Sequence, residues 1–154
     1  MTRKWAAIVF LGLVQLGFLK VTSKPPKNVF LIPTGISSNA ARFEPKPSDT
    51  QNLAERKKIL FLIEQVKASP FRFIRNGSEY SGEEAAAHLK MKYGHAYTQI
   101  NTAKDFILHV ASSSLLTGDP YLVVTPSGER YLAQDLFFNE LERLEQTAVR
   151  QKTV

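Results

Sequence analysis

Residues 71–89, FRFIRNGSEYSGEEAAAHL, restrict the fold of this chain more than any other stretch. A short run of β type from Phe71 to Arg75 predicts a strand. The pair Asn76-Gly77 follows and accepts positive φ, so we expect a tight turn there. Ser81 and Glu84 then fit a capping box, in which each side chain bonds the backbone N–H of the other residue. A strand, a turn and the start of a helix are therefore predicted in direct succession.

The rest of the chain beyond residue 48 has three more helical patterns and a hairpin. Apolar side chains at helical spacing predict helices over residues 49–68, from Thr102 onwards, and over residues 134–146. We expect Ser48 or Asp49 to cap the first of these helices, and Thr102 with Asp105 to cap the second. Residues 121–125, YLVVT, read as a strand, and a Pro-Ser-Gly-Glu loop separates them from a short returning strand at 130–132. This order predicts an α+β fold, with a small antiparallel sheet of about three strands covered by about four helices.

The N-terminal segment has the pattern of an export signal. A basic start with Arg3 and Lys4 precedes the apolar run WAAIVFLGLVQLGFL, which is short for a membrane span of about 20 residues. We expect residues 1–23 to be a signal peptide that is cleaved after Ser23. Because no A-x-A sequence follows the apolar run, an uncleaved membrane anchor is the alternative.

Residues 24–48 read as a poorly ordered linker, since they hold five of the eight prolines of the chain. An apolar island at residues 29–32, VFLI, interrupts this linker. It is either a hydrophobic patch without a structural role or a clamp that docks on the domain. Residues 49–147 form the predicted single domain, and residues 148–154 are expected to fray.

The net charge of +6 belongs to the leader and linker. Residues 1–48 hold seven basic side chains and one acidic side chain, whereas residues 49–154 hold thirteen of each. A neutral domain does not offer the basic face that neutralises phosphates, so nucleic acid is not an expected partner.

The sequence lacks the motifs that several common kinds of catalytic and binding site require. The chain has no cysteine, which excludes disulfides and thiolate metal sites, and it has no G-x-S-x-G, P-loop or G-x-G-x-x-G motif. His88 and His95 share a helix face but lie about 10 Å apart along its axis, too far to share one metal ion, and we interpret them as surface histidines. We therefore expect no metal site, no cofactor and no catalytic residues.

A cluster of polar side chains beside the tight turn is the candidate binding site. Arg75, Ser78, Glu79 and Tyr80 lie within six residues and could line a small pocket together with Tyr121. The alternative is that Arg75 pairs locally with Glu79, while Tyr80 packs onto the following helix.

Five short motifs give the sequence a family likeness. They are FIRNGSEY at 73–80, EAAAHL at 84–89, KY at 92–93, TAKDFI at 102–107 and GDPY at 118–121. In order and spacing over residues 53–145 they resemble the YfeK-like family of small exported proteins of Gram-negative bacteria, which carry a domain of unknown function. The resemblance implies a periplasmic protein, with an inner-membrane anchor facing the periplasm as the alternative. It implies no catalytic residue.

Two functional hypotheses follow. The leading one is a non-enzymatic periplasmic protein that binds another protein or an envelope component, which predicts an exposed apolar patch and no deep pocket. The alternative is a small-ligand binder or weak enzyme. It predicts that Arg75, Glu79 and Tyr80 point into one concave site near Tyr121.

Overall fold

The computed structural model describes residues 24–32 and 50–152. The predicted signal peptide, most of the predicted linker and the helix cap expected at Ser48 or Asp49 lie outside these residues. The elements, in chain order, are α1 (Thr50–Ala68), β1 (Arg72–Arg75), β2 (Ser78–Tyr80), α2 (Gly82–Ala96), α3 (Ala103–Phe106), the π-helical turn η1 (Ile107–Ala111), β3 (Leu122–Val124), β4 (Arg130–Leu132) and α4 (Ala133–Lys152).

The four strands form one antiparallel sheet in the order β2-β1-β3-β4. The α+β class is as predicted, but the sheet has one strand more than the three expected, namely β2. Asn76 and Gly77 both have positive φ, at 50° and 77°, as a two-residue hairpin turn of type I′ requires. The chain therefore returns at once beside β1, and Tyr80 pairs with Phe73.

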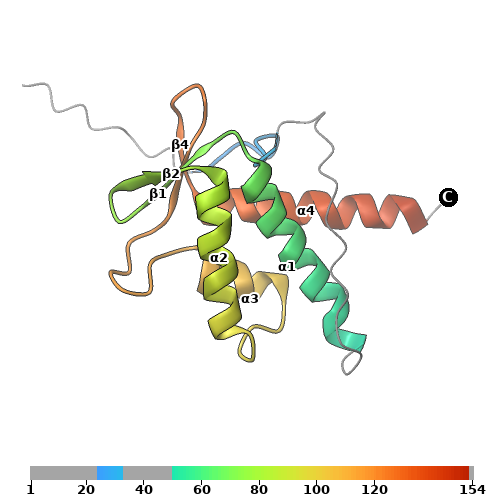
Figure 1. Cartoon of the computed structure of the whole chain (residues 1–154). Helices are drawn as coiled ribbons and strands as arrows, with labels where there is room; N and C mark the ends of the chain where they lie inside the picture. The colour runs from blue at the N-terminus through green and yellow to red at the C-terminus, as the bar shows by residue number, and fades with distance from the viewer. Residues whose placement is uncertain (1–23, 33–49, 153–154) are drawn as a thin grey trace, which may run out of the picture.

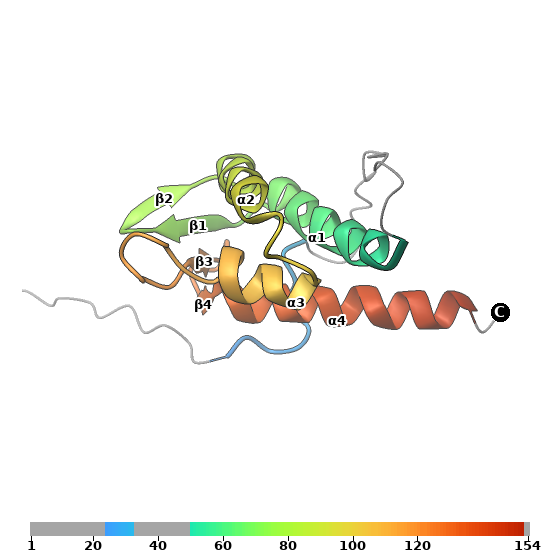
Figure 2. The same ribbon diagram turned by 90° about the horizontal axis from the view of Figure 1, so that it is seen from below.

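Helices α1 and α2 pack side by side on one side of the molecule, while α4 runs along the other side with α3 next to it (Figures 1 and 2). The sheet lies toward one end of this arrangement. In the part of the chain that the structure describes, no helix combines the length and the apolar character that a membrane crossing requires.

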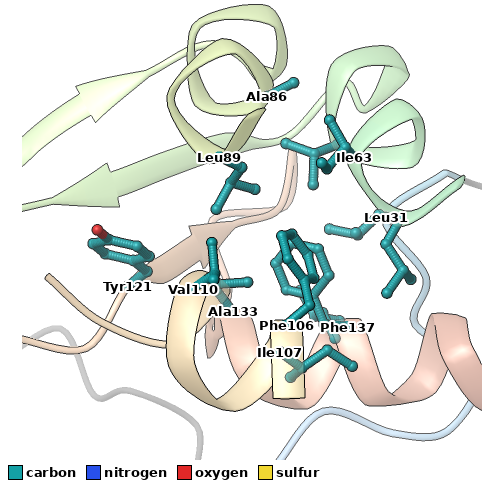
Figure 3. Close-up of a cluster of buried hydrophobic side chains, with 14 of the residues drawn as sticks. Leu31, Ile63, Ala86, Leu89, Phe106, Ile107, Val110, Tyr121, Ala133 and Phe137 are labelled. Atoms are coloured by element: carbon teal, nitrogen blue, oxygen red, sulfur yellow. The ribbon is translucent and has the colours of Figure 1, made fainter. Parts of the chain in front are cut away.

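Side chains from all of these helices meet in one hydrophobic core (Figure 3). The rings of Phe106 and Phe137 lie at its centre, 6.2 Å apart and nearly perpendicular to each other. Ile63 from α1 and Leu89 from α2 point into the same core (Figure 3). Tyr121 lies at the edge of the cluster, with its hydroxyl oxygen turned away from both phenylalanines (Figure 3).

The described residues 24–32, called here the N-terminal strap, lie against α4. Leu31 and Ile32 are 0% and 2% exposed, and the Leu31 N–H donates to Glu140 Oε1 over 2.7 Å. Asn139 Nδ2 donates to the carbonyls of Pro26 and Val29. The sequence assigns these residues to a poorly ordered linker. The structure folds them onto the domain instead, as the clamp alternative for residues 29–32 predicts, because Leu31 fills the core and the side chains of α4 bind the strap's backbone.

Of the helix caps expected from the sequence, the two that fall within the described residues are present. Ser81 and Glu84 form the capping box of α2, and Thr102 and Asp105 form that of α3. α2 continues through Gly94 to its end at Ala96. α4 also extends beyond the predicted end near residue 146, so residues 148–152 of the predicted frayed tail are helical.

Candidate functional site

A cavity of about 170 Å³ lies where β1 and β2, α2, η1 and the start of α4 meet. Its lining residues are Phe73, Ile74, Arg75, Tyr80, Glu84, Ala85, His88, Leu89, Ala111, Tyr121, Ala133 and Phe137. Most of these side chains are apolar or aromatic, and the charged ones come from β1 and α2. The cavity therefore combines an apolar wall with a small group of polar side chains, as small-molecule sites usually do.

Arg75 is the central polar side chain of this site. Its Nη1 lies 2.7 Å and 2.8 Å from the two ring nitrogens of His88. Its Nη2 donates to the Tyr80 hydroxyl over 3.2 Å, and the guanidinium carbon lies 4.8 Å from the centre of the Tyr80 ring. Side chains from β2 and α2 thus hold the guanidinium from two sides.

The pairing register explains why Arg75 bonds Tyr80 and not Glu79. Cross-strand partners share a face of the sheet, and successive residues alternate between faces. Phe73 pairs with Tyr80 and Arg75 with Ser78, so Arg75 and Tyr80 lie on the face that lines the cavity. Glu79 lies on the opposite face and contacts the exposed Arg72, with 3.7 Å between the charged atoms.

His88 is a neutral acceptor in this arrangement. Arginine can only donate hydrogen bonds, so the imidazole nitrogen that receives the bond carries no proton. Burial lowers the pKa of His88, and the nearby charges of Arg75 and Lys92 lower it further. The pKa of Tyr80 is lowered as well, first by its hydrogen bond from Arg75. The two partners of the guanidinium are an imidazole and a hydroxyl group, and neither supplies a carboxylate that would balance its positive charge.

Lys92 lies behind the cavity as a second, buried cation. Its Nζ donates to the carbonyls of Val110 and Ser113 over 2.6 Å and 2.9 Å, and to the Tyr121 hydroxyl over 3.3 Å. The side chain is 8% exposed, and burial, with the charge of Arg75, lowers the pKa of Lys92 to about 8. Lys92 therefore fixes the orientation of Tyr121, whose ring contacts His88 edge-on.

The structure brings together three of the five residues that the sequence nominates. Arg75, Tyr80 and Tyr121 line the cavity, whereas Ser78 and Glu79 lie on the exposed part of β2. The local pair between Arg75 and Glu79, the alternative considered from the sequence, is replaced by the contact of Glu79 with Arg72.

Two residues of the site escaped the sequence reasoning. His88 was interpreted as a surface histidine, although it lies on the same helix face as Leu89 and Lys92 and lines the cavity. Lys92 follows Leu89 by three residues and precedes the buried Tyr93, and a lysine inside such an apolar stripe is the signal that could have revealed it. Within residues 24–32 and 50–152, no three His, Asp or Glu side chains gather as a metal site would require.

Known proteins offer a family match and one partial relative. A model of the family of unknown function DUF5329 matches residues 53–145. The uncharacterized protein YfeK of Salmonella typhimurium (strain LT2) is 51% identical over 49 residues. That stretch is 32% of this chain and 41% of YfeK, so the match spans about two fifths of the relative's length. No solved structure gives a significant match.

Proposed function

The chain belongs to DUF5329, a family of unknown function, and on that premise we propose that it is an exported, non-enzymatic protein that binds a small ligand in the cavity beside Arg75. The observation that carries this proposal is the guanidinium of Arg75, which His88 and Tyr80 hold at a largely apolar cavity. The proposal thus adopts the pocket hypothesis of the sequence analysis, with His88 in the place of Glu79.

The size of the cavity restricts the ligand. An engineered apolar cavity of about 150 Å³ is large enough for benzene, and the volume here is about 170 Å³. The ligand is therefore a compact molecule with an apolar body of about one ring. Larger metabolites such as nucleotides or sugars exceed this volume and do not suit walls formed by Phe73, Leu89 and Phe137.

The polar groups of the cavity favour binding over catalysis. A general base needs a free nitrogen and a pKa near the working pH. The imidazole of His88 is occupied by Arg75, and its pKa is lowered by burial. Lys92 uses its ammonium protons on two backbone carbonyls and Tyr121. These contacts fix side chains in place, which suits recognition of a ligand without chemical change.

Export rests on the N-terminal sequence and the family resemblance. The basic start and the apolar run at residues 5–19 have the pattern of a signal peptide. We place the protein in the periplasm, with anchoring in the inner membrane as the alternative. N-terminal sequencing of protein from the periplasmic fraction tests this: a start near Lys24 supports cleavage, and an intact Met1 in the membrane fraction contradicts it.

A cavity-filling substitution tests the ligand site. Ala85 is half-buried on α2 and lines the cavity, whereas Ala87 is exposed on the same helix. In a screen of small apolar and amphipathic molecules by ligand-observed NMR, we expect wild-type protein and Ala87→Leu to bind the same compounds. Ala85→Leu should lose them because the added side chain occupies the cavity. Retained binding by Ala85→Leu contradicts the proposed site.

A second candidate function, binding of an envelope protein, has one specific observation in its favour. Leu115 and Leu116 are adjacent in the loop between η1 and β3 and are 81% and 89% exposed. Two leucines so exposed at a loop suit contact with an apolar surface of another protein. Crosslinking in intact cells with wild type and a Leu115→Ser, Leu116→Ser double variant tests this. A partner lost in the double variant supports the second function.

A further inference from the structure

We infer that the ligand of this cavity is a small monocarboxylic acid, with its carboxylate on Arg75 and its apolar body inside the cavity. This inference rests on the proposed function and adds the chemical class of the ligand. It follows from three features of the site: the donors that Arg75 has left, the charges around them, and the apolar walls.

Arg75 keeps donors available for a ligand. A guanidinium has five N–H groups in a planar fork. The bonds to His88 and Tyr80 use one N–H from each of the two Nη atoms, so three N–H groups are left. Among the described residues no carboxylate forms an ion pair with Arg75. Because arginine matches a carboxylate with two parallel hydrogen bonds, this fork is suited to an acid.

The charges around the cavity favour an anion. Arg75 and Lys92 are two cations near His88, and both lower its pKa in addition to the effect of burial. The acidic side chain in the lining is Glu84, whose Oε2 accepts hydrogen bonds of 2.8 Å from both the N–H and the hydroxyl of Ser81. These bonds, chiefly the backbone one, lower the pKa of Glu84. Its charge is therefore directed at the N-terminus of α2.

The walls of the cavity limit the ligand to one charged group. Beyond Arg75 and Glu84 the lining is formed by aromatic rings, aliphatic side chains and His88. A second carboxylate inside this space would be buried without a cation to pair with it, which is strongly unfavourable. A ring or short chain with about six to eight carbon atoms fits the volume. Benzoate, benzyl alcohol and benzylamine therefore form a matched series of probes that differ only in the polar group.

The experiment titrates these three probes into the purified protein and follows amide chemical shifts by NMR. We expect benzoate to bind about tenfold or more tightly than benzyl alcohol, the range that a charge-assisted hydrogen-bond pair supplies. Benzylamine should bind most weakly, because its ammonium faces Arg75. Arg75→Met should remove the advantage of benzoate, so that benzoate binds no more tightly than benzyl alcohol to this variant. Arg75→Lys keeps the charge but loses the fork, and should give an intermediate affinity.

The outcomes separate the inference from the proposed function. If benzyl alcohol or benzylamine binds as well as benzoate and Ala85→Leu abolishes that binding, the cavity is a ligand site but the carboxylate inference is wrong. If none of the three probes binds, or if Ala85→Leu has no effect, the proposed function itself fails. The comparison among the three probes uses wild-type protein alone, so it decides the inference even if an Arg75 variant does not fold.

Discussion

We expect opposite effects on stability when two glycines of α2, Gly82 and Gly94, are each replaced by alanine. At Gly82, in the first turn of α2, an added Cβ would lie 2.3 Å from the Val66 carbonyl oxygen and 2.8 Å from that of Ser69. At Gly94 the same added atom meets nothing within 4 Å. Replacing each glycine by alanine therefore tests how closely α2 approaches the end of α1.

The magnitudes follow from these distances. Overpacking costs about 1–3 kcal/mol, and Gly82→Ala should lie near the upper end because backbone oxygens cannot rotate away. The Val66 carbonyl is also held by the Ser69 N–H over 3.1 Å. Gly94→Ala should stabilise the protein by about 0.5–1 kcal/mol, the difference between glycine and alanine inside a helix. The two variants should then differ by roughly 3–4 kcal/mol.

Urea denaturation followed by circular dichroism measures both variants. In thermal unfolding the same gap corresponds to roughly 4 °C per kcal/mol for a domain of this size, with the Gly94 variant above wild type and the Gly82 variant below it. A Gly82→Ala protein as stable as wild type would show that α1 and α2 are not in such close contact. A destabilised Gly94→Ala protein would show that α2 does not continue through this position.

Two further predictions concern buried charges. Glu140→Gln should lower the free energy of unfolding by about 2–4 kcal/mol, measured in urea. The substitution removes the charge that pairs with Arg143, while the buried amide must still accept the hydrogen bond from the Leu31 N–H of the strap. Glu142→Gln, which breaks the exposed pair with Lys27, should cost less than about 1 kcal/mol, and equal losses would contradict the role of the buried carboxylate. Lys92 has a pKa of about 8 in the folded protein, lowered from its ordinary 10.5 by burial. The unfolded chain therefore holds more protons between these values, and wild-type stability should rise with pH there relative to Lys92→Met, by at most about 1.4 kcal/mol per pH unit. Parallel pH profiles of the two proteins would show that Lys92 is not buried as a cation.

Features that depend on neighbouring residues in the chain were predictable from the sequence. The capping box of Ser81 and Glu84 needs only a hydroxyl and a carboxylate three residues apart, and the structure confirms it. The turn at Asn76-Gly77 needs only residues that tolerate positive φ. Local chemistry of this kind is specified within a few residues, so it can be identified without knowledge of the tertiary fold.

β2 escaped prediction because its residues do not favour a strand. Ser78, Glu79 and Tyr80 are mostly exposed and contain no β-branched side chain. They become a strand because the hairpin turn places them beside β1, where Tyr80 pairs with Phe73. The pairing also decides which side chains share a face. The sequence spacing alone therefore gave no means to separate Tyr80, which lines the cavity, from Glu79, which does not.

The partners that complete the site are distant in the chain. Arg75 and His88 are thirteen residues apart, and Lys92 and Tyr121 are twenty-nine residues apart. Sequence reasoning could select Arg75, Tyr80 and Tyr121 as unusual polar residues, but it interpreted His88 as a surface histidine because no local partner was visible. For the same reason the sequence left open whether residues 29–32 dock on the domain, since the residue of α4 that binds Leu31 lies more than one hundred positions later.

The most direct test of the central claim locates a bound ligand by intermolecular nuclear Overhauser effects. With benzoate in the sample, we expect contacts from its ring protons to the methyl groups of Ala85 and Leu89, which line the cavity from α2. Contacts to Leu115 and Leu116 in their place, or a complete absence of contacts at saturating benzoate, would contradict the assignment of the cavity as the ligand site.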